Sequence, residues 1–296
     1  MAKYLTLLVW LLISAPSAFA ETFKIAIASD DDLYVAEILK LAVNAAGGDH
    51  SVEVVRIAPI AQGRALRALA DGRAAYNVLY SGYSMQREQE LTMVDFPLTR
   101  GLLGYRVLAV RPNAKRPLSS EALFDPQGKP VCFGSGNDWP DTAIMRLAGL
   151  CVVTAADENL WPMLMRGRFE AFPRSVIEAK SEIAMISGGE EGPPPVIDQN
   201  LLLAYKQDLF FFMPLRAKEQ AKLIEDGLKK LHAEGRYDPF FYSIPIVKEA
   251  LEELITHPRT VVRLETPKEF VALNQIPERY WYDFDDASSF VENMPN

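Results

Sequence analysis

A short motif occurs twice in this chain, 95 residues apart, and it constrains the fold more than any other feature. The motif is Leu-x-x-Gly-Arg, at residues 69–73 and again at residues 164–168. Each copy follows an apolar, helix-like stretch and precedes a short strand-like stretch. Glycine ends helices because it adopts positive φ without a Cβ clash. We interpret the motif as a repeated helix–turn–strand unit, which predicts two similar α/β lobes with a ligand cleft between them. Chance recurrence is the alternative, because helix–glycine–strand transitions are common.

The first 20 residues have the pattern of an export signal. Lys3 precedes an apolar run at 5–13, which is too short to cross a bilayer as a helix. The run is followed by Ala18-Phe19-Ala20, which fits the small-x-small cleavage rule. The sequence therefore predicts cleavage after Ala20 and a soluble periplasmic protein. An uncleaved membrane anchor is the alternative.

Composition narrows the classes of function. The formal net charge of −8 and the lack of any Lys/Arg run argue against a nucleic-acid partner. Cys132 and Cys151 are a disulfide candidate in an oxidising compartment, and two free thiols are the alternative. These cysteines and three scattered histidines have no metal-ligand spacing, so we expect no metal site and no cofactor. No nucleophile elbow or His-Glu-x-x-His pattern occurs, so we do not expect an enzyme.

Predicted strands and helices alternate along the chain. The strands are expected at 23–28, 51–57, 76–80, 104–110, 131–133, 152–153, 170–172, 209–215 and 261–264. The helices are expected at 33–46, 59–70, 87–91, 139–148, 160–165, 175–185, 217–232 and 246–255. This alternation predicts an α/β fold with sheets flanked by helices.

Several short motifs follow one another in a specific order. They are Leu-Ala-Asp-Gly-Arg at 69–73, Ser-Met-Gln-Arg at 84–87 with Val-Asp-Phe-Pro at 94–97, Gly-Ser-Gly at 134–136, Gly-Arg-Phe-Glu-Ala-Phe at 167–172, and Gly-Arg-Tyr-Asp at 235–238. Over about residues 22–243 this order resembles the type II periplasmic solute-binding proteins. More narrowly, it resembles the family that serves polar amino-acid ABC importers.

The resemblance implies a two-lobed fold with two mixed sheets, joined by two hinge crossings and closing around the ligand. After the signal peptide at 1–20, the first lobe would comprise 21–110 and 213–296, and the second lobe 111–212. The crossings would lie near Val110-Arg111 and Phe212-Met213. The segment after residue 246 extends beyond the usual end of the family, and it would pack on the first lobe or form a partner surface.

Arg87 is the first candidate for ligand binding. In the resemblance it holds the position of the arginine that clamps the ligand's α-carboxylate, which suits a planar guanidinium with parallel N–H donors. The alternative is an exposed helix charge beside Glu88 and Glu90.

Arg174 departs from the family pattern. It stands where the family has an aspartate that binds the ligand's ammonium group, which an arginine would repel. This favours an anionic ligand held by one arginine from each lobe. The alternative is that Arg174 pairs with Glu170 or Glu178.

Further candidate binding residues come from both lobes. Backbone groups of two loops and several pocket-wall side chains complete the predicted site: Ser81, Gly82, Ser84, Gly134, Ser135, Gly136, Trp139, Gln62, Arg64 and Tyr34. For Gln62, Arg64 and Tyr34 a structural role is favoured over ligand contact, and for the glycine loop the alternative is a helix start without a ligand. Asp138 would cap the helix that starts near Trp139, where Pro140 and Asp141 suit the first turn. Trp139 would line the pocket or fill the core of its lobe.

We therefore predict a periplasmic, monomeric protein that binds a small anionic or amino-acid-like solute by hinge closure. Its partner would be an ABC transporter permease. A sensor or adaptor without a transporter, acting on a membrane sensor, is one alternative. An exported enzyme resembling cyclohexadienyl dehydratases is the other, with Asp141 or Glu178 as the acid.

Overall fold

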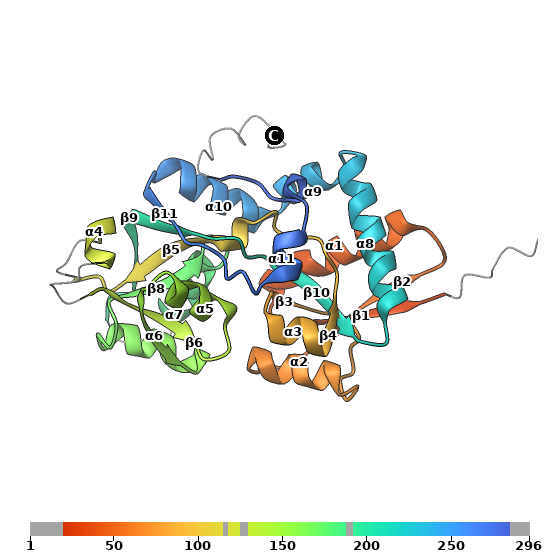
Figure 1. Ribbon diagram of the computed structural model, residues 1–296, viewed down its shortest axis with the longest axis horizontal. Helices are drawn as coiled ribbons and strands as arrows, with labels where there is room; N and C mark the ends of the chain where they lie inside the picture. Colours follow the sequence, from red (N-terminus) through yellow and green to blue (C-terminus); the bar gives the residue numbers. More distant parts are fainter. Residues whose placement is uncertain (1–19, 115–117, 125–129, 188–191, 285–296) are drawn as a thin grey trace, which may run out of the picture.

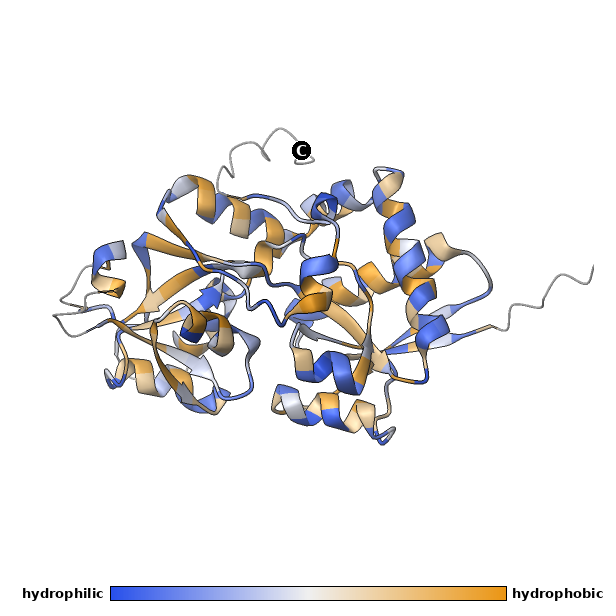
Figure 2. Cartoon of the chain, in the orientation of Figure 1, coloured by the Kyte–Doolittle hydropathy of each residue, from blue (hydrophilic) through white to orange (hydrophobic). Residues whose placement is uncertain are grey.

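The computed structural model describes residues 20–114, 118–124, 130–187 and 192–284, which form two lobes side by side (Figure 1). Apolar residues concentrate on the strands and on the inward faces of the helices (Figure 2). Within the described residues, no helix has the length and apolarity needed to cross a membrane. The predicted signal peptide lies outside these residues, except for its last residue.

The first lobe contains two small sheets and five helices. Its elements are β1 (Thr22–Ile27), η1 (Asp30–Asp32), α1 (Leu33–Ala46), β2 (Ser51–Arg56), α2 (Gln62–Ala70), β3 (Leu79–Gly82), α3 (Met85–Glu90), β4 (Leu91–Met93), β10 (Leu209–Pro214), α8 (Lys218–Ala233) and α9 (Tyr237–Ser243). Strands β1 and β2 are parallel, whereas β10 lies between β3 and β4 and is antiparallel to both. A bridge between Ile25 and Val78 joins the two sheets. The bridge thus ties the middle of β1 to the residue that precedes β3.

Helices α1 and α8 pack closely across one face of this lobe. The contact requires a glycine, because a Cβ on Gly227 would lie 2.0 Å from the carbonyl oxygen of Ala42. Leu39, Ile224 and Leu228 bury their side chains in the same core. Together these helices cover one face of the strands that carry the cleft residues.

The second lobe is built on a six-stranded sheet with strand order β11-β9-β5-β8-β6-β7, in which β11 is the C-terminal strand Thr260–Arg263. Its elements are β5 (Tyr105–Val110), α4 (Ser120–Leu123), β6 (Cys132–Gly136), α5 (Pro140–Leu147), β7 (Cys151–Ala155), α6 (Asp157–Met165), β8 (Ala171–Ser175), α7 (Ala179–Ser187) and β9 (Val196–Ala204). Cys132 and Cys151 begin adjacent parallel strands in register and form a disulfide. The predicted α/β fold with mixed sheets is confirmed.

The connections between the lobes differ from the predicted crossings. Strand β5, which we expected to end the first lobe, pairs with β8 and β9 in the second. Strand β10 already belongs to the first lobe at Leu209. We propose that the crossings lie at 94–104, which includes η2 (Leu102–Gly104), and at 205–208. Both strands are uniformly buried, so their sequence does not reveal which sheet they join.

Buried Asp208 joins the two crossings. Its carboxylate accepts hydrogen bonds from the backbone N–H and the hydroxyl of Thr99, at 2.8 and 2.9 Å, and from the backbone N–H of Gly101. These contacts hold the two connecting segments against each other.

The C-terminal segment contacts both lobes. It contains α10 (Pro245–Thr256), β11 (Thr260–Arg263), α11 (Val271–Gln275) and η3 (Glu278–Tyr280). Strand β11 extends the second-lobe sheet alongside β9. The chain then returns to the first lobe, where Phe270 packs edge-on against Tyr83, with ring centroids 5.1 Å apart, and Tyr280 packs against Phe96. Figure 1 shows α11 between the lobes.

The repeated motif forms the same structure twice. Gly72 follows α2 with φ 67°, and Gly167 follows α6 with φ 68°. Strands β3 and β8 come after these turns, as predicted. The sequence analysis missed β9, because Asp198, Gln199 and Asn200 interrupt its apolar pattern.

Candidate ligand-binding cleft

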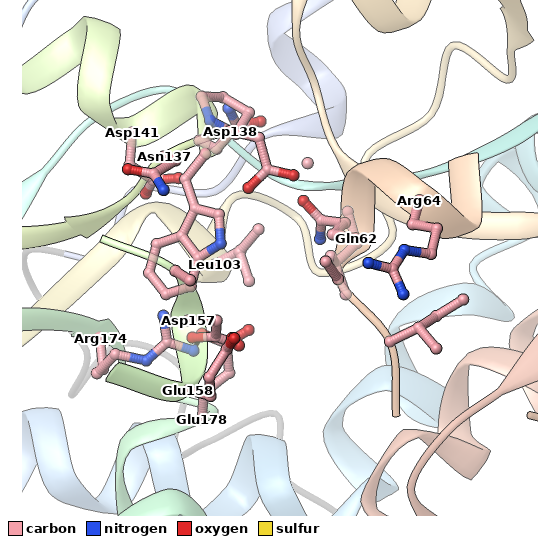
Figure 3. Close-up of a pocket in the computed structure, with 18 of the residues that line it drawn as sticks. Gln62, Arg64, Leu103, Asn137, Asp138, Asp141, Asp157, Glu158, Arg174 and Glu178 are labelled. Carbon is pink, nitrogen blue, oxygen red and sulfur yellow. Dashed lines mark ion pairs between the residues drawn. The ribbon is translucent and has the colours of Figure 1, made fainter. Parts of the chain in front are cut away.

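A cavity of about 510 Å³ lies between the lobes. Figure 3 shows Gln62 and Arg64 on the first-lobe wall, facing Asp138, Asp157 and Arg174 on the second-lobe wall. The start of α2 supplies the first wall, and the starts of α5 and α6 supply much of the second. The remaining lining residues are Ile60, Ala61, Gly82, Leu103, Arg106, Asn137, Trp139, Pro140, Asp141, Ala156, Glu158, Glu178, Gln207 and Leu209.

Arg87 is buried directly behind this cavity. Its guanidinium donates hydrogen bonds to Ser81 Oγ (2.8 Å), the Gly82 carbonyl (2.6 Å), Gln62 Oε1 (2.5 Å) and the Asp138 carbonyl (3.2 Å). No carboxylate of the described residues lies within ion-pair distance. Burial lowers the pKa of Arg87 to about 10. The first lobe therefore holds a buried cation that only neutral acceptors contact, three of which belong to residues lining the cavity.

Asp138 connects the two lobes across the cavity. Its carboxylate accepts a 3.0 Å hydrogen bond from the backbone N–H of Gly63, in the first turn of α2. Its carbonyl accepts the bond from Arg87 described above. The predicted capping role is wrong, because Trp139 is the N-cap residue of α5 and no side chain caps that end. Pro140 and Asp141 occupy the first turn as expected.

Arg174 is not free to clamp a ligand in this arrangement. Glu182 accepts hydrogen bonds from both Nε and Nη2, and Glu178 lies 3.1 Å from Nη2. Burial by itself would lower the pKa of Arg174, but these two carboxylates raise it above the ordinary value. The guanidinium also lies over the Trp139 ring, 4.6 Å from its centroid. The alternative of an internal ion pair is thus correct for Glu178, whereas Glu170 instead accepts from the Cys132 backbone N–H.

Arg106 is a further paired arginine that the sequence analysis missed. It lies 2.7 Å from Asp141 and 3.5 Å from Glu178, and Asp141 also accepts a 2.5 Å bond from the Tyr205 hydroxyl. Both arginines of the second-lobe wall are therefore neutralised by carboxylates of the same wall.

Several carboxylates that line the cleft cavities have no such partner among the described residues, and burial affects Asp157 and Asp32 among them. Asp157 begins α6 and lines the 510 Å³ cavity, whereas Asp32 lines an adjoining cavity of about 350 Å³. Among the described residues, no Lys, Arg or His lies within ion-pair distance of either one. Burial raises the pKa of both above the ordinary value. One available signal was that Asp157 follows the carboxyl end of β7, where ligands commonly bind in α/β sheets.

The predicted glycine loop of the second lobe does not line the cavity. Strand β6 continues through Gly134, Ser135 and Gly136, so these residues pair with β7 instead of facing the cleft. A Cβ on Gly134 would lie 2.3 Å from the Phe169 ring, and one on Gly136 would lie 2.4 Å from Trp139. The buried Ser135 hydroxyl accepts a hydrogen bond from the Thr142 hydroxyl. These glycines allow aromatic packing, and the cavity wall begins one residue later, at Asn137.

The other predicted binding residues either line a cleft cavity or support residues that lie beside it. Gln62, Arg64, Gly82 and Trp139 line the main cavity, and Tyr34 lines the adjoining one. Trp139 also stacks on Phe172, with ring centroids 6.0 Å apart, so it serves the pocket wall and the lobe core together. Buried Ser81 accepts from Arg87, and Ser84 caps α3.

Solved structures share this architecture. A protein from Wolinella succinogenes, described as a binding component of an ABC transporter and complexed with lysine, matches with a TM-score of 0.52 and 11% identity. The match covers 75% of this chain and 94% of that chain. The chain has the type II periplasmic binding fold. A histidine kinase sensor domain with similarity to periplasmic binding proteins matches with a TM-score of 0.51 and 16% identity, over 76% of this chain and 96% of that one. No protein-family model matches the sequence, and the search of curated proteins finds no match.

Within the type II periplasmic binding fold, this cleft combines paired and unpaired charges. The described residues contain no group of three or more His, Cys, Asp or Glu side chains arranged to hold a metal ion. The arrangement suits the binding of a small organic solute through charged and polar groups.

Proposed function

We propose that this protein binds a small zwitterionic, amino-acid-like solute in the cleft between its lobes. One observation carries the proposal: the first lobe has a buried cation without an ion-pair partner, and the second-lobe wall has a carboxylate without one. The cation is Arg87, and the carboxylate is Asp157. Asp32, which also lacks an ion-pair partner, belongs to the first lobe and lines the adjoining cavity. A buried charge is stabilised by an opposite charge, so a solute with both charges complements this site.

Solute entry requires the lobes to separate at Asp138. Opening breaks its contacts with Gly63 and Arg87, which are single hydrogen bonds between the lobes. The solute carboxylate then replaces the Asp138 carbonyl at Arg87, and the ammonium group is directed towards Asp157. This proposal keeps the predicted role of Arg87. It replaces Arg174 as a second clamp, because that side chain is already paired with Glu178 and Glu182.

We further propose that the protein acts in the periplasm as a monomeric component of an ABC importer. The likeness to a transporter component supports this role by fold alone. A ligand-binding sensor is the second candidate, because a histidine kinase sensor domain has the same fold. A dehydratase-like activity is less favoured. Its candidate acids, Asp141 and Glu178, both pair with Arg106 of the same wall, so neither carboxyl group is free to approach a solute.

Calorimetric titration of the ligand-stripped protein tests the proposal. The test ligands are zwitterionic α-amino acids, dicarboxylates and simple primary amines. We expect binding of amino acids only, and weaker binding in Asp157→Asn than in the exposed control Asp226→Asn. Selective binding of dicarboxylates would restore the anionic-ligand hypothesis and refute this one.

A further inference from the structure

The cleft does not end at the charged groups. The 350 Å³ cavity shares Gln62, Asp157 and Leu209 with the main cavity. It also shares Asp31, Tyr34, Ser181 and Ile246 with a third cavity of about 720 Å³. The three cavities therefore adjoin one another along a single path between the lobes, and the largest of them lies at the end far from Asp138.

This third cavity, here called the α10 groove, is lined mainly by apolar groups. Its walls come from the start of α1, from α7, and from the junction of α9 and α10. The apolar lining residues are Leu33, Tyr34, Ala184, Phe240, Ile244, Pro245 and Ile246. Four of these belong to the segment 240–246, where α9 ends and α10 begins.

Charged residues of the α10 groove are mostly paired with each other or with neighbours. Lys180 lies 3.4 Å from Glu253, and Glu37 lies 2.6 Å from Lys40. Asp30 pairs with an arginine of β2 at 2.5 Å. The other two acids, Asp31 and Glu249, are exposed to water. The groove therefore offers apolar contact area without a buried charge that requires a polar ligand group.

We propose that the solute carries a long apolar chain on its amino-acid-like head, and that this chain lies in the α10 groove. The inference rests on the proposed function, since the head occupies the charged part of the path. Continuity of the path determines the occupant: the cavity that Asp157 lines also has Tyr34 and Ile246 in its wall, and both of these residues line the α10 groove. A free amino acid of ordinary size would leave the groove empty.

Chain length is the direct test. The probes are straight-chain α-amino acids of increasing length: 2-aminobutyrate, 2-aminohexanoate, 2-aminooctanoate and 2-aminodecanoate. Burial of each methylene group is expected to raise the affinity about fourfold. Titrations with the wild-type protein should therefore show a steady rise in affinity along the series.

Two variants with the same substitution locate the chain. Ala184→Trp fills the groove from an exposed position on α7, so folding should be unaffected. Ala233→Trp, at an exposed alanine of α8 outside the three cavities, is the matched control. We expect Ala184→Trp to remove the chain-length dependence while 2-aminobutyrate still binds, and Ala233→Trp to behave as wild type.

The outcomes separate the two proposals. Binding of 2-aminobutyrate with equal or weaker binding of longer probes would overturn the groove assignment and leave the proposed function standing. A rise with chain length that Ala184→Trp does not reduce would also overturn the assignment. Failure of the whole series to bind would refute both.

Discussion

Replacement of Arg87 by methionine separates ligand binding from folding. The guanidinium would give the solute carboxylate two charged hydrogen bonds, each contributing about 1.5–3 kcal/mol. Their loss amounts to about 3–6 kcal/mol, which corresponds to an affinity roughly 10² to 10⁴ times lower. Titration calorimetry with a zwitterionic ligand of the wild-type protein measures this loss directly.

The folded state should tolerate the same change. Burial already lowers the pKa of Arg87 to about 10, so its charge is costly to hold in the interior. Methionine removes that cost together with four hydrogen bonds, and we expect the free energy of unfolding to change by less than about 2 kcal/mol.

Arg67→Met provides the matched control for this experiment. Arg67 lies on an exposed position of α2 and lines none of the cleft cavities. Wild-type affinity in a folded Arg87→Met protein would refute the assignment of Arg87 to the site. Loss of affinity in Arg67→Met would show that any removed charge weakens binding.

Three further predictions concern stability, each measured by urea unfolding. Burial raises the pKa of Asp208 to about 7 from 3.8, so its ionisation opposes folding. The protonated carboxyl group therefore contributes fully to stability below pH 3.8, and this contribution is lost as the pH rises through about 7. Asp208→Asn should remove this part of the pH dependence of the free energy of unfolding. An unchanged pH dependence in this variant would contradict the prediction. Gly227→Ala should lower the free energy of unfolding by about 1–3 kcal/mol, because its Cβ would overlap the Ala42 carbonyl oxygen. An unaltered midpoint would mean that α1 and α8 separate easily. Reduction of the Cys132–Cys151 disulfide should lower the free energy of unfolding by about 3 kcal/mol, because the bond closes a loop of the chain and so restricts the unfolded state. Equal stability with and without reductant would argue against this.

Local sequence signals predicted most of the fold correctly. Apolar periodicity gave α1 at its observed bounds, Leu33–Ala46, and gave α8 to within one residue. The glycines at 72 and 167 were correctly interpreted as helix ends, because positive φ is a property of the residue and its own backbone. The sequence left a Cys132–Cys151 disulfide and two free thiols as alternatives, and the paired starts of β6 and β7 bring the two cysteines together as a disulfide.

Sequence signals failed where distant segments choose their partners. The glycines of 134–136 have the composition of a ligand loop, yet Phe169 and Trp139 pack where their side chains would be. Nothing in the local pattern around Arg174 distinguishes a ligand clamp from a pair with Glu182, which is eight residues away on α7.

The sequence alone determined that this chain forms repeated helix–turn–strand units, and it singled out Arg87 as a candidate. Hydrophobic periodicity and backbone preference act over a few residues, so these features can be derived from the local sequence. The tertiary structure decided which sheet β5 and β10 join, which arginines are already neutralised, and that the C-terminal segment lines the α10 groove. These features depend on contacts between residues far apart in the chain, and the cost of burying a charge depends on what packs around it.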